Sequence, residues 1–332
     1  MKAQIIRSFG GPELFEEATL PDPEAAAGEV LVRVHASSVN PVDYKVRTAG
    51  PKGIAPALPA VLGCDIAGEV VALGEGVSDF KVGDAVYGCA GGVTGMPGAY
   101  AELFAADARL LALKPKSLDM RQAAALPLVT ITAWEGLFDR ANLQAGQSVL
   151  VHGGAGGVGH AAIQLAKARG AKVYATVSSA AKGEIARKLG ADETINYREE
   201  TVEQYVARLT DGEGFDLVYD ATGGDQLELS FEAAKISGQV VTIVSQFTSD
   251  LTLMHIKGLS LHVVFMLIPM LHDMARETHG KLLSEAAAIA EAGKFSPLLD
   301  QRRFSLSEVG DAHRHLESGK AVGKVVIDIA GE

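Results

Sequence analysis

The chain has 332 residues, enough for two domains, and its hydrophobic fraction of 48% and charged fraction of 21% are typical of globular proteins. A formal net charge of −11 without a basic cluster disfavours a nucleic-acid partner. The two cysteines, Cys64 and Cys89, are too few for a disulfide scaffold and fit a reducing compartment. The amino terminus lacks the apolar stretch of a signal peptide, and the apolar window 261–270 is about half the roughly 20 residues that a membrane span needs. We therefore expect a cytoplasmic protein with no membrane segment.

Short β-type runs fill the chain up to about Ala123. They alternate with glycine and proline turns, as in the runs 29–35, 66–73 and 84–87. Many short strands separated by such turns predict a compact, barrel-like β domain.

Apolar strands alternate with helices from about residue 124. We expect strands at 148–152, 172–177, 215–220 and 239–244, each followed or preceded by a helix. This alternation predicts a parallel sheet with helices on both faces, as in doubly wound dinucleotide-binding domains. The helix expected at 280–292 and the strand at 324–329 have no place in that sheet, so we assign them to the first domain. The prediction is an α/β protein with a β domain, 1–123, completed by 268–332, and a nucleotide-binding domain, 124–267.

A glycine motif follows the first strand of the second domain. Gly154-x-Gly156-x-x-Gly159 comes directly after an apolar strand and opens a helix. The first glycine is expected to allow a tight turn, the second a close approach of the pyrophosphate, and the third close packing of helix and strand. The helix N-terminus would then offer N–H groups to phosphates. The predicted cofactor-binding residues here are Gly154, Ala155, Gly156, Gly157, Val158 and Gly159.

The end of the next strand favours NADPH over NADH. NAD sites usually place Asp or Glu there to hold the ribose 2′-hydroxyl. Here the strand runs into Ser178 and Ser179 with Lys182 nearby, and no carboxylate precedes Glu184. Hydroxyls and an ammonium group suit a 2′-phosphate. The alternative is that Lys182 only begins a solvated helix.

Several motifs spread along the chain resemble one family. They are Asn40-Pro-Val-Asp43 with Arg47, the stretches 62–71, 82–86 and 124–134, the glycine motif, the strand 216–220 and Gly323-Lys-Val-Val326. Together they resemble, over essentially the full length, the zinc-independent quinone oxidoreductase branch (zeta-crystallin-like) of the medium-chain dehydrogenase/reductase superfamily. The resemblance implies a chaperonin-10 (GroES)-like catalytic domain, a Rossmann domain, and a homodimer joined through the nucleotide-domain sheets. The apolar strand 259–267 would lie at that junction, or else be buried within one subunit.

The resemblance also implies roles for individual residues. Asn40 would lie by the nicotinamide and the substrate carbonyl, and Tyr44 would bond the substrate oxygen or donate a proton; a turn role for Asn40 and a packing role for Tyr44 are the alternatives. Asp43 and Arg47 would form a structural pair. The remaining residues assigned to the cofactor by this resemblance are Thr130, Thr132, Tyr197, Val244, Ser245 and Lys320.

No metal site is expected. The zinc enzymes of the superfamily bind catalytic zinc at positions that correspond here to Asn40, Cys64 and the vicinity of Leu128, a poor ligand set. Without a Lewis acid, hydride addition to a quinone or an α,β-unsaturated carbonyl compound is easier than alcohol oxidation. We predict an NADPH-dependent reductase of such small molecules. The alternatives are an enoyl-thioester reductase and an NADPH-binding regulatory or structural protein with little turnover. We interpret all nine histidines as structural or surface residues.

Overall fold

The computed structural model describes residues 1–49, 53–244 and 246–329. The chain divides into two compact units, one formed by Met1–Leu128 with Leu267–Glu332 and the other by Val129–Met266. The first unit is a β barrel and the second a doubly wound parallel sheet, so the predicted fold class is confirmed. Within the described ranges, every helix is too short or too polar to cross a lipid bilayer.

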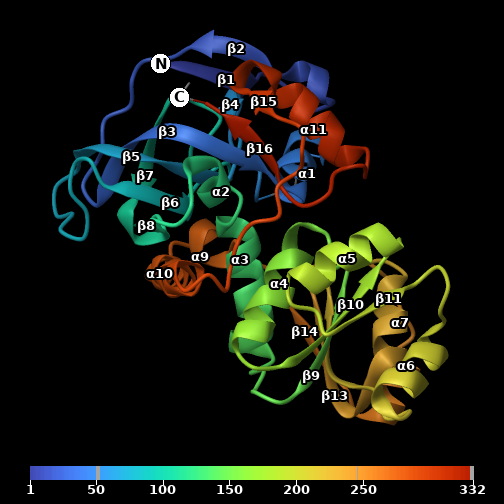
Figure 1. Ribbon diagram of the computed structural model, residues 1–332. Coiled ribbons are helices and arrows are strands. Elements are labelled where there is room, and N and C mark those ends of the chain that lie inside the picture. Colours follow the sequence, from blue (N-terminus) through green and yellow to red (C-terminus); the bar gives the residue numbers. More distant parts are fainter. Residues whose placement is uncertain (50–52, 245, 330–332) are drawn as a thin grey trace. The chain divides into compact units, whose positions relative to one another are not determined.

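Two sheets build the barrel unit (Figure 1). The larger one has the order β15-β16-β3-β5-β6-β8, with β7 also paired to β3. The smaller one has the order β2-β1-β4. The strands are β1 (Lys2–Ile6), β2 (Glu16–Thr19), β3 (Glu29–Val39), β4 (Ala60–Val61), β5 (Asp65–Leu73), β6 (Ala85–Cys89), β7 (Leu103–Asp107), β8 (Leu111–Leu113), β15 (Phe304–Ser305) and β16 (Val325–Asp328).

The first unit also contains several helices. They are α1 (Pro41–Ala49), α2 (Met120–Ala124), α9 (Ile268–Leu271), α10 (Glu277–Glu291) and α11 (Val309–Glu317), with 3-10 turns at Pro12–Leu14, Ala108–Leu110 and Leu306–Glu308. A further helix, α3 (Pro127–Trp134), spans the boundary between the units and continues as the π-helix Glu135–Arg140.

The longest strand, β3, contributes side chains to the core of the barrel unit. Its alternate residues Val30, Val32 and Val34 are fully buried, as expected where successive side chains point to opposite faces. The C-terminal strand β16 pairs antiparallel with β3, with Val325 opposite Val39. Both residues belong to one apolar cluster, so the C-terminal segment completes the barrel core.

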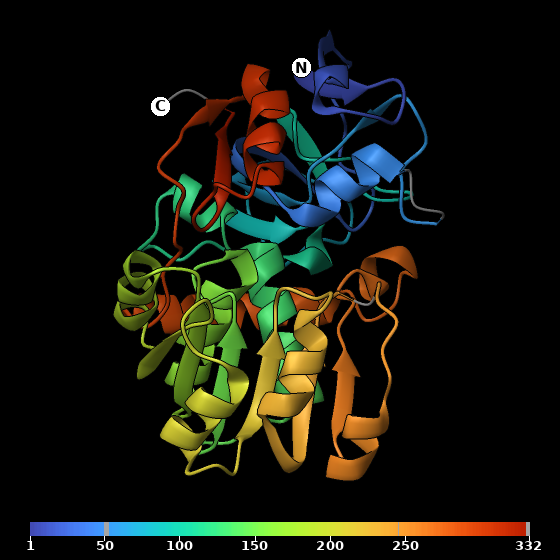
Figure 2. The same cartoon turned by 90° about the vertical axis from the view of Figure 1, so that its right-hand side faces the viewer.

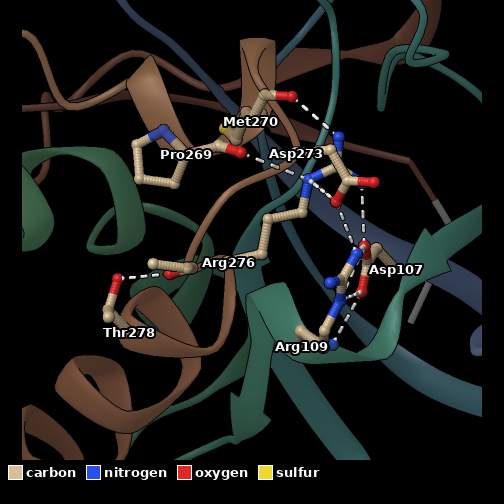
Figure 3. A network of polar contacts seen from close by, with 8 residues as sticks. Asp107, Arg109, Pro269, Met270, Asp273, Arg276 and Thr278 are labelled. Atoms are coloured by element: carbon tan, nitrogen blue, oxygen red, sulfur yellow. Dashed lines mark hydrogen bonds and ion pairs between the residues drawn. The ribbon is translucent and has the colours of Figure 1, made fainter.

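An ionic network connects the end of β7 to residues 269–276, which follow the point where the chain re-enters the first unit (Figure 3). Asp107, the last residue of β7, accepts hydrogen bonds from Arg109 at 2.7 Å and from Arg276 at 2.9 Å. Arg276 also donates to the carbonyl of Met270 at 2.7 Å, and Arg109 donates to Asp273 at 2.8 Å. A cavity of about 410 Å³ borders this network, but its two arginines are already paired with carboxylates. The network therefore serves to anchor the chain.

The second unit is a six-stranded parallel sheet (Figure 2). Its order is β11-β10-β9-β12-β13-β14, and the chain moves outward in both directions from β9 and β12. Ligands of such sheets bind at the carboxyl edge where the order reverses, here between β9 and β12. The strands are β9 (Ser148–His152), β10 (Lys172–Val177), β11 (Glu193–Asn196), β12 (Phe215–Asp220), β13 (Ala234–Thr242) and β14 (Ser260–Val263); the helices are α4 (Gly157–Ala168), α5 (Ala180–Lys188), α6 (Val202–Thr210), α7 (Gln226–Ala233) and α8 (Thr252–Lys257).

The apolar segment 259–267 is divided between interior and surface. It forms β14 at the end of the strand order, paired with β13. Leu259 and Met266 are buried, whereas Val263 and Phe265 are 45% and 41% exposed. Burial within the subunit therefore accounts for part of its hydrophobicity, and an apolar strip remains along the sheet edge.

Candidate functional site

Two glycines of the turn between β9 and α4, Gly154 and Gly159, have no room for a side chain. A Cβ atom on Gly159 would lie 2.1 Å from the carbonyl oxygen of Gly153, and one on Gly154 would lie 2.8 Å from the Cβ of Ala175. The left-handed residue of the turn is Gly153, with φ of 73°, so the tight turn begins one residue before the motif and Gly154 serves in packing. Gly154, the first glycine of the motif, therefore has a packing role, whereas the sequence suggested that it allows the tight turn.

The N-terminus of α4 is open to an anion. Its N-cap is Gly156, and no side chain of the described residues caps it. Gly156 is exposed, and Gly157 and Val158 are partly exposed, whereas Ala155 and Gly159 are buried. Uncapped N–H groups and the positive end of the helix dipole fit a phosphate group. These residues therefore suit the pyrophosphate of a dinucleotide.

The ends of β10 and β11 bring the predicted 2′-phosphate residues to the same edge of the sheet. Val177 pairs with Asn196, and the N–H of Tyr197 donates to the carbonyl of Val177 at 3.2 Å. Ser178 and Lys182 are half-buried, and Tyr197 is 50% exposed.

Ser179 is the N-cap of α5. Its Oγ accepts from the N–H of Lys182 at 3.3 Å. Glu184, the first carboxylate after β10, is exposed and paired with Arg187 at 2.6 Å. Among the described residues 178–183, which follow β10, no carboxylate occupies the position where NAD-binding domains hold the ribose.

Two threonines on α3 belong to the nucleotide-binding unit. Thr130 and Thr132 are buried, and the carbonyl of Thr132 accepts from the Tyr219 hydroxyl at 2.8 Å. The Thr130 Oγ1 atom has no hydrogen-bond partner among the described residues. An orphaned buried hydroxyl is costly, so this atom fits a polar group of a ligand.

Three further predicted residues occupy different places. Val244 is half-buried just after β13, where its carbonyl accepts from Thr242 Oγ1 at 3.0 Å. Ser245 lies outside the described residues. Lys320 is exposed in the turn after α11, in the barrel unit, and its approach to the cofactor phosphate stays a prediction.

A pocket of about 360 Å³ at the carboxyl edge of this unit was not predicted. His152 and Thr176 line it from β9 and β10, Tyr197 from the turn after β11, and Gln226 from α7. The position of His152 directly before the glycine turn is what could have indicated this pocket from the sequence. Gln226, which contacts His152, lies 74 positions away in the chain, so no local sequence pattern predicts that contact.

Asp65 is the centre of a buried polar cluster in the barrel unit. Its carboxylate accepts from Ser38 Oγ at 2.7 Å, Asn40 Nδ2 at 2.8 Å and the N–H of Leu128 at 2.9 Å. The Lys324 ammonium lies 3.6 Å away and donates to Asn40 Oδ1. The Asn40 amide, 0% exposed, is therefore oriented at both of its ends.

The first turn of α1 extends this cluster. Asp43 accepts from the N–H of Asn40 at 2.7 Å and from the Cys64 thiol at 3.2 Å, and burial raises the pKa of Asp43 to about 6. Arg47, expected to pair with Asp43, instead binds Glu317 at 2.6 Å. That expectation was wrong because α11 packs on α1 and presents a nearer carboxylate.

Tyr44 is half-buried on α1. Burial, followed by the negative charge of Glu317, raises the pKa of its phenol. Like an ordinary phenol, whose pKa is about 10, the hydroxyl is protonated at neutral pH and can donate a hydrogen bond.

The positions that the zinc enzymes use as ligands converge here around the Asp65 carboxylate. Asn40 and the N–H of Leu128 both bond Asp65, next to Cys64, and Lys324 supplies a positive charge. Nowhere in the described chain do three His, Cys, Asp or Glu side chains gather in a way that would hold a metal ion. The residues present do not fit a zinc site.

Comparisons with known proteins agree with this geometry. Residues 26–116 match the family model described as alcohol dehydrogenase GroES-like domain, and residues 189–327 match the one described as zinc-binding dehydrogenase. The chain is 37% identical to the chloroplastic NADPH-dependent alkenal/one oxidoreductase of Arabidopsis thaliana, over 98% of this chain and 79% of that protein.

Two solved structures cover nearly the whole chain. An alcohol dehydrogenase superfamily protein from Novosphingobium aromaticivorans shares 44% identity at a TM-score of 0.95, covering 99% of this chain and 100% of that one. The Escherichia coli quinone oxidoreductase, solved with NADPH, shares 28% identity at a TM-score of 0.88 with the same coverage. The chain belongs to the medium-chain dehydrogenase/reductase superfamily, among the quinone and alkenal oxidoreductases. It is an oxidoreductase.

Proposed function

We propose that this protein is an NADPH-dependent reductase that transfers hydride to quinones or α,β-unsaturated carbonyl compounds without zinc. The observation that carries the proposal is the carboxyl edge of the nucleotide-binding sheet. An uncapped helix N-terminus follows the glycine turn, and Ser178 and Lys182 follow β10 where a carboxylate would select NAD. The names of two relatives, an NADPH-dependent alkenal/one oxidoreductase and a quinone oxidoreductase solved with NADPH, support it.

Each part of the dinucleotide has candidate partners in this chain. The N–H groups of Gly157 and Val158 would hold the pyrophosphate. Ser178, Ser179, Lys182 and Tyr197 would hold the 2′-phosphate, where a hydroxyl-rich, cationic site replaces the usual carboxylate. The Thr130 hydroxyl and the backbone near Val244 would hold the nicotinamide carboxamide. The bound cofactor supplies the hydride, and the protein supplies position and polarity.

The substrate needs hydrogen-bond donors rather than a Lewis acid. Hydride addition to a quinone or to the β-carbon of an enone places negative charge on a conjugated oxygen, and a proton must follow. The Tyr44 phenol is protonated at neutral pH, as an ordinary tyrosine with a pKa of about 10 is, so we propose it as the donor to that oxygen. We retain Asn40 as a residue that orients the reacting groups, since Asp65 and Lys324 hold its amide in one direction.

We also propose a homodimer formed through β14. This strand ends the sheet order, and Val263 and Phe265 keep an exposed apolar strip beside it. A second copy would pair this edge and cover the strip. Sedimentation equilibrium checks the state, and Val263→Lys, which places a charge on the strip, is expected to give monomers. The two free, buried cysteines support a cytoplasmic location.

The test of the proposed function combines binding with turnover. NADPH and NADH are titrated against wild type, Lys182→Ala and the control Lys188→Ala, an exposed residue at the far end of α5. Wild type is expected to prefer NADPH by at least about tenfold, and only Lys182→Ala should lose the preference. Equal affinity for both cofactors that ignores Lys182→Ala would exclude NADPH selectivity at this site.

Turnover then separates the possible substrate classes. The protein is incubated with NADPH and a panel of quinones, short enones and enoyl thioesters. Reduction of quinones or enones supports the proposal. Reduction of thioesters alone would make the protein an enoyl-thioester reductase, and tight NADPH binding without any turnover would indicate a regulatory role.

A further inference from the structure

A carboxylate lies near the phenol of Tyr44 in the barrel unit. Tyr44 and Arg47 share one face of α1, because residues three positions apart on a helix are neighbours. Arg47 binds Glu317, the last residue of α11, at 2.6 Å. Burial, followed by the negative charge of Glu317, raises the pKa of the Tyr44 phenol, and no other charged group in the described part of the chain shifts that pKa. Glu317 is therefore the charge that acts on the proposed proton donor.

The two members of this ion pair differ in their access to solvent. The Arg47 side chain is 0% exposed, and its Nε atom donates to the carbonyl of Gly10 at 3.2 Å. The Glu317 side chain is 27% exposed. A molecule that approaches from solvent can therefore reach the carboxylate of the pair but not its guanidinium group.

The surroundings of Glu317 do not cancel its charge at the phenol. Because Glu317 ends α11, it lies where the helix carbonyl groups carry partial negative charge. The lysines of the two elements, Lys45 on α1 and Lys320 after α11, are exposed, and neither shifts the Tyr44 pKa. An anion beside Tyr44 would thus be repelled, whereas an uncharged molecule would not.

We propose that Glu317 is a specificity-determining residue whose partly exposed carboxylate, held near Tyr44 by the buried Arg47, disfavours substrates that carry a negative charge. The protein then reduces uncharged enones and quinones in preference to enones that bear a carboxylate. The inference rests on the proposed function, in which Tyr44 donates to the substrate oxygen. It adds a second criterion for substrates, their charge, to the reactive group that the proposed function requires.

The test compares two substrates that differ in charge but share one reactive group. One is the vinyl ketone 4-oxo-5-hexenoate, which carries a carboxylate, and the other is its uncharged methyl ester. The ratio of kcat/KM for the ester to kcat/KM for the carboxylate is measured at saturating NADPH. Wild type is expected to prefer the ester, and Glu317→Gln should lower the ratio about fivefold. Any effect of Glu317 on hydride or proton transfer is common to both substrates and cancels in the ratio.

Two further variants separate the charge of Glu317 from its contact with Arg47. Glu317→Asp keeps the charge on a shorter side chain, so it should keep the preference for the ester. Asp311→Asn is the matched control for removal of a charge from α11, because Asp311 is exposed and paired with Arg314; it should leave the ratio unchanged. Added salt should lower the ratio of wild type but not that of Glu317→Gln. Thermal unfolding curves verify that each variant is folded.

The outcomes separate this inference from the function on which it rests. A wild-type ratio that persists in folded Glu317→Gln, or that is lost in Glu317→Asp as well, would overturn charge selection by Glu317 while leaving NADPH-dependent enone reduction intact. A wild-type protein that reduces neither vinyl ketone nor benzoquinone with NADPH would instead contradict the proposed function.

Discussion

The Lys324 ammonium lies 3.6 Å from the Asp65 carboxylate, and the two side chains are 3% and 0% exposed. Asp65 already accepts three hydrogen bonds, from Ser38, Asn40 and the N–H of Leu128. The lysine supplies a positive charge beside this buried carboxylate. The pair joins the strand β5 to the segment that closes the barrel.

Removing one member of this pair should cost more than removing a surface charge. Lys324→Met leaves the Asp65 carboxylate buried without its cation, and we expect a loss of about 3–5 kcal/mol of unfolding free energy. The double variant Asp65→Asn with Lys324→Met should recover part of that loss. Chemical denaturation measures both. The control is Lys81→Met, an exposed lysine of the same unit, which should change stability by less than about 0.5 kcal/mol. An unaltered unfolding curve for Lys324→Met would show that the pair contributes nothing.

Stability at mildly acidic pH should depend on His279. This side chain is 4% exposed on α10, its Nδ1 atom has no partner among the described residues, and burial lowers its pKa to about 4. Because the unfolded chain binds a proton near pH 6.5 and the folded chain does not, this group's contribution is present above pH 6.5 and lost as pH falls toward 4.

The corresponding variant isolates that contribution. His279→Leu cannot be protonated, so it should gain about 2 kcal/mol relative to wild type between pH 7 and pH 5. Guanidinium denaturation at both pH values measures the difference. His255→Gln, at an exposed position on α8, serves as control and should follow the wild-type pH dependence. Parallel pH profiles for wild type and His279→Leu would contradict the assignment.

The fold was predictable because its signals are local. The alternation of strands and helices and the glycine motif each lie within short stretches of sequence, and they placed Gly156, Gly159, Ser178 and Lys182 at one edge of one sheet. Contacts between distant side chains were not predictable in this way. The partners of Asp65 come from β3, α3 and the segment before β16, and that of Arg47 comes from α11. No periodicity encodes such contacts, because they depend on how the elements pack.

The third glycine of the motif should tolerate no side chain. The Cβ of Gly159→Ala would lie 2.1 Å from the carbonyl oxygen of Gly153, so the turn or the helix must move, at a cost of about 1–3 kcal/mol. A displaced turn should also weaken NADPH binding. Gly183→Ala is the matched control in a neighbouring helix, since its nearest contact would be 3.1 Å from Thr194 Oγ1 and helix propensity favours alanine. Equal stability of the two variants would argue against the close helix–turn contact.

Thr130 offers a substitution whose effects on stability and on binding should have opposite signs. Its Oγ1 atom is buried and has no partner among the described residues, so Thr130→Val removes an unsatisfied polar group and should leave the cofactor-free protein as stable as wild type or up to about 2 kcal/mol more stable. The same change removes the proposed hydrogen bond to the nicotinamide carboxamide and should raise the Kd for NADPH about fivefold to tenfold.

The control variant, Thr210→Val, should show the reverse pattern. The Thr210 hydroxyl, at the end of α6, donates to the carbonyl of Val206 at 2.6 Å and accepts from the N–H of Gly214 at 2.9 Å. It should lose stability and keep its affinity for NADPH. Denaturation and fluorescence titration of both variants measure the two quantities, and a Thr130→Val protein that binds NADPH as tightly as wild type would remove Thr130 from the cofactor site.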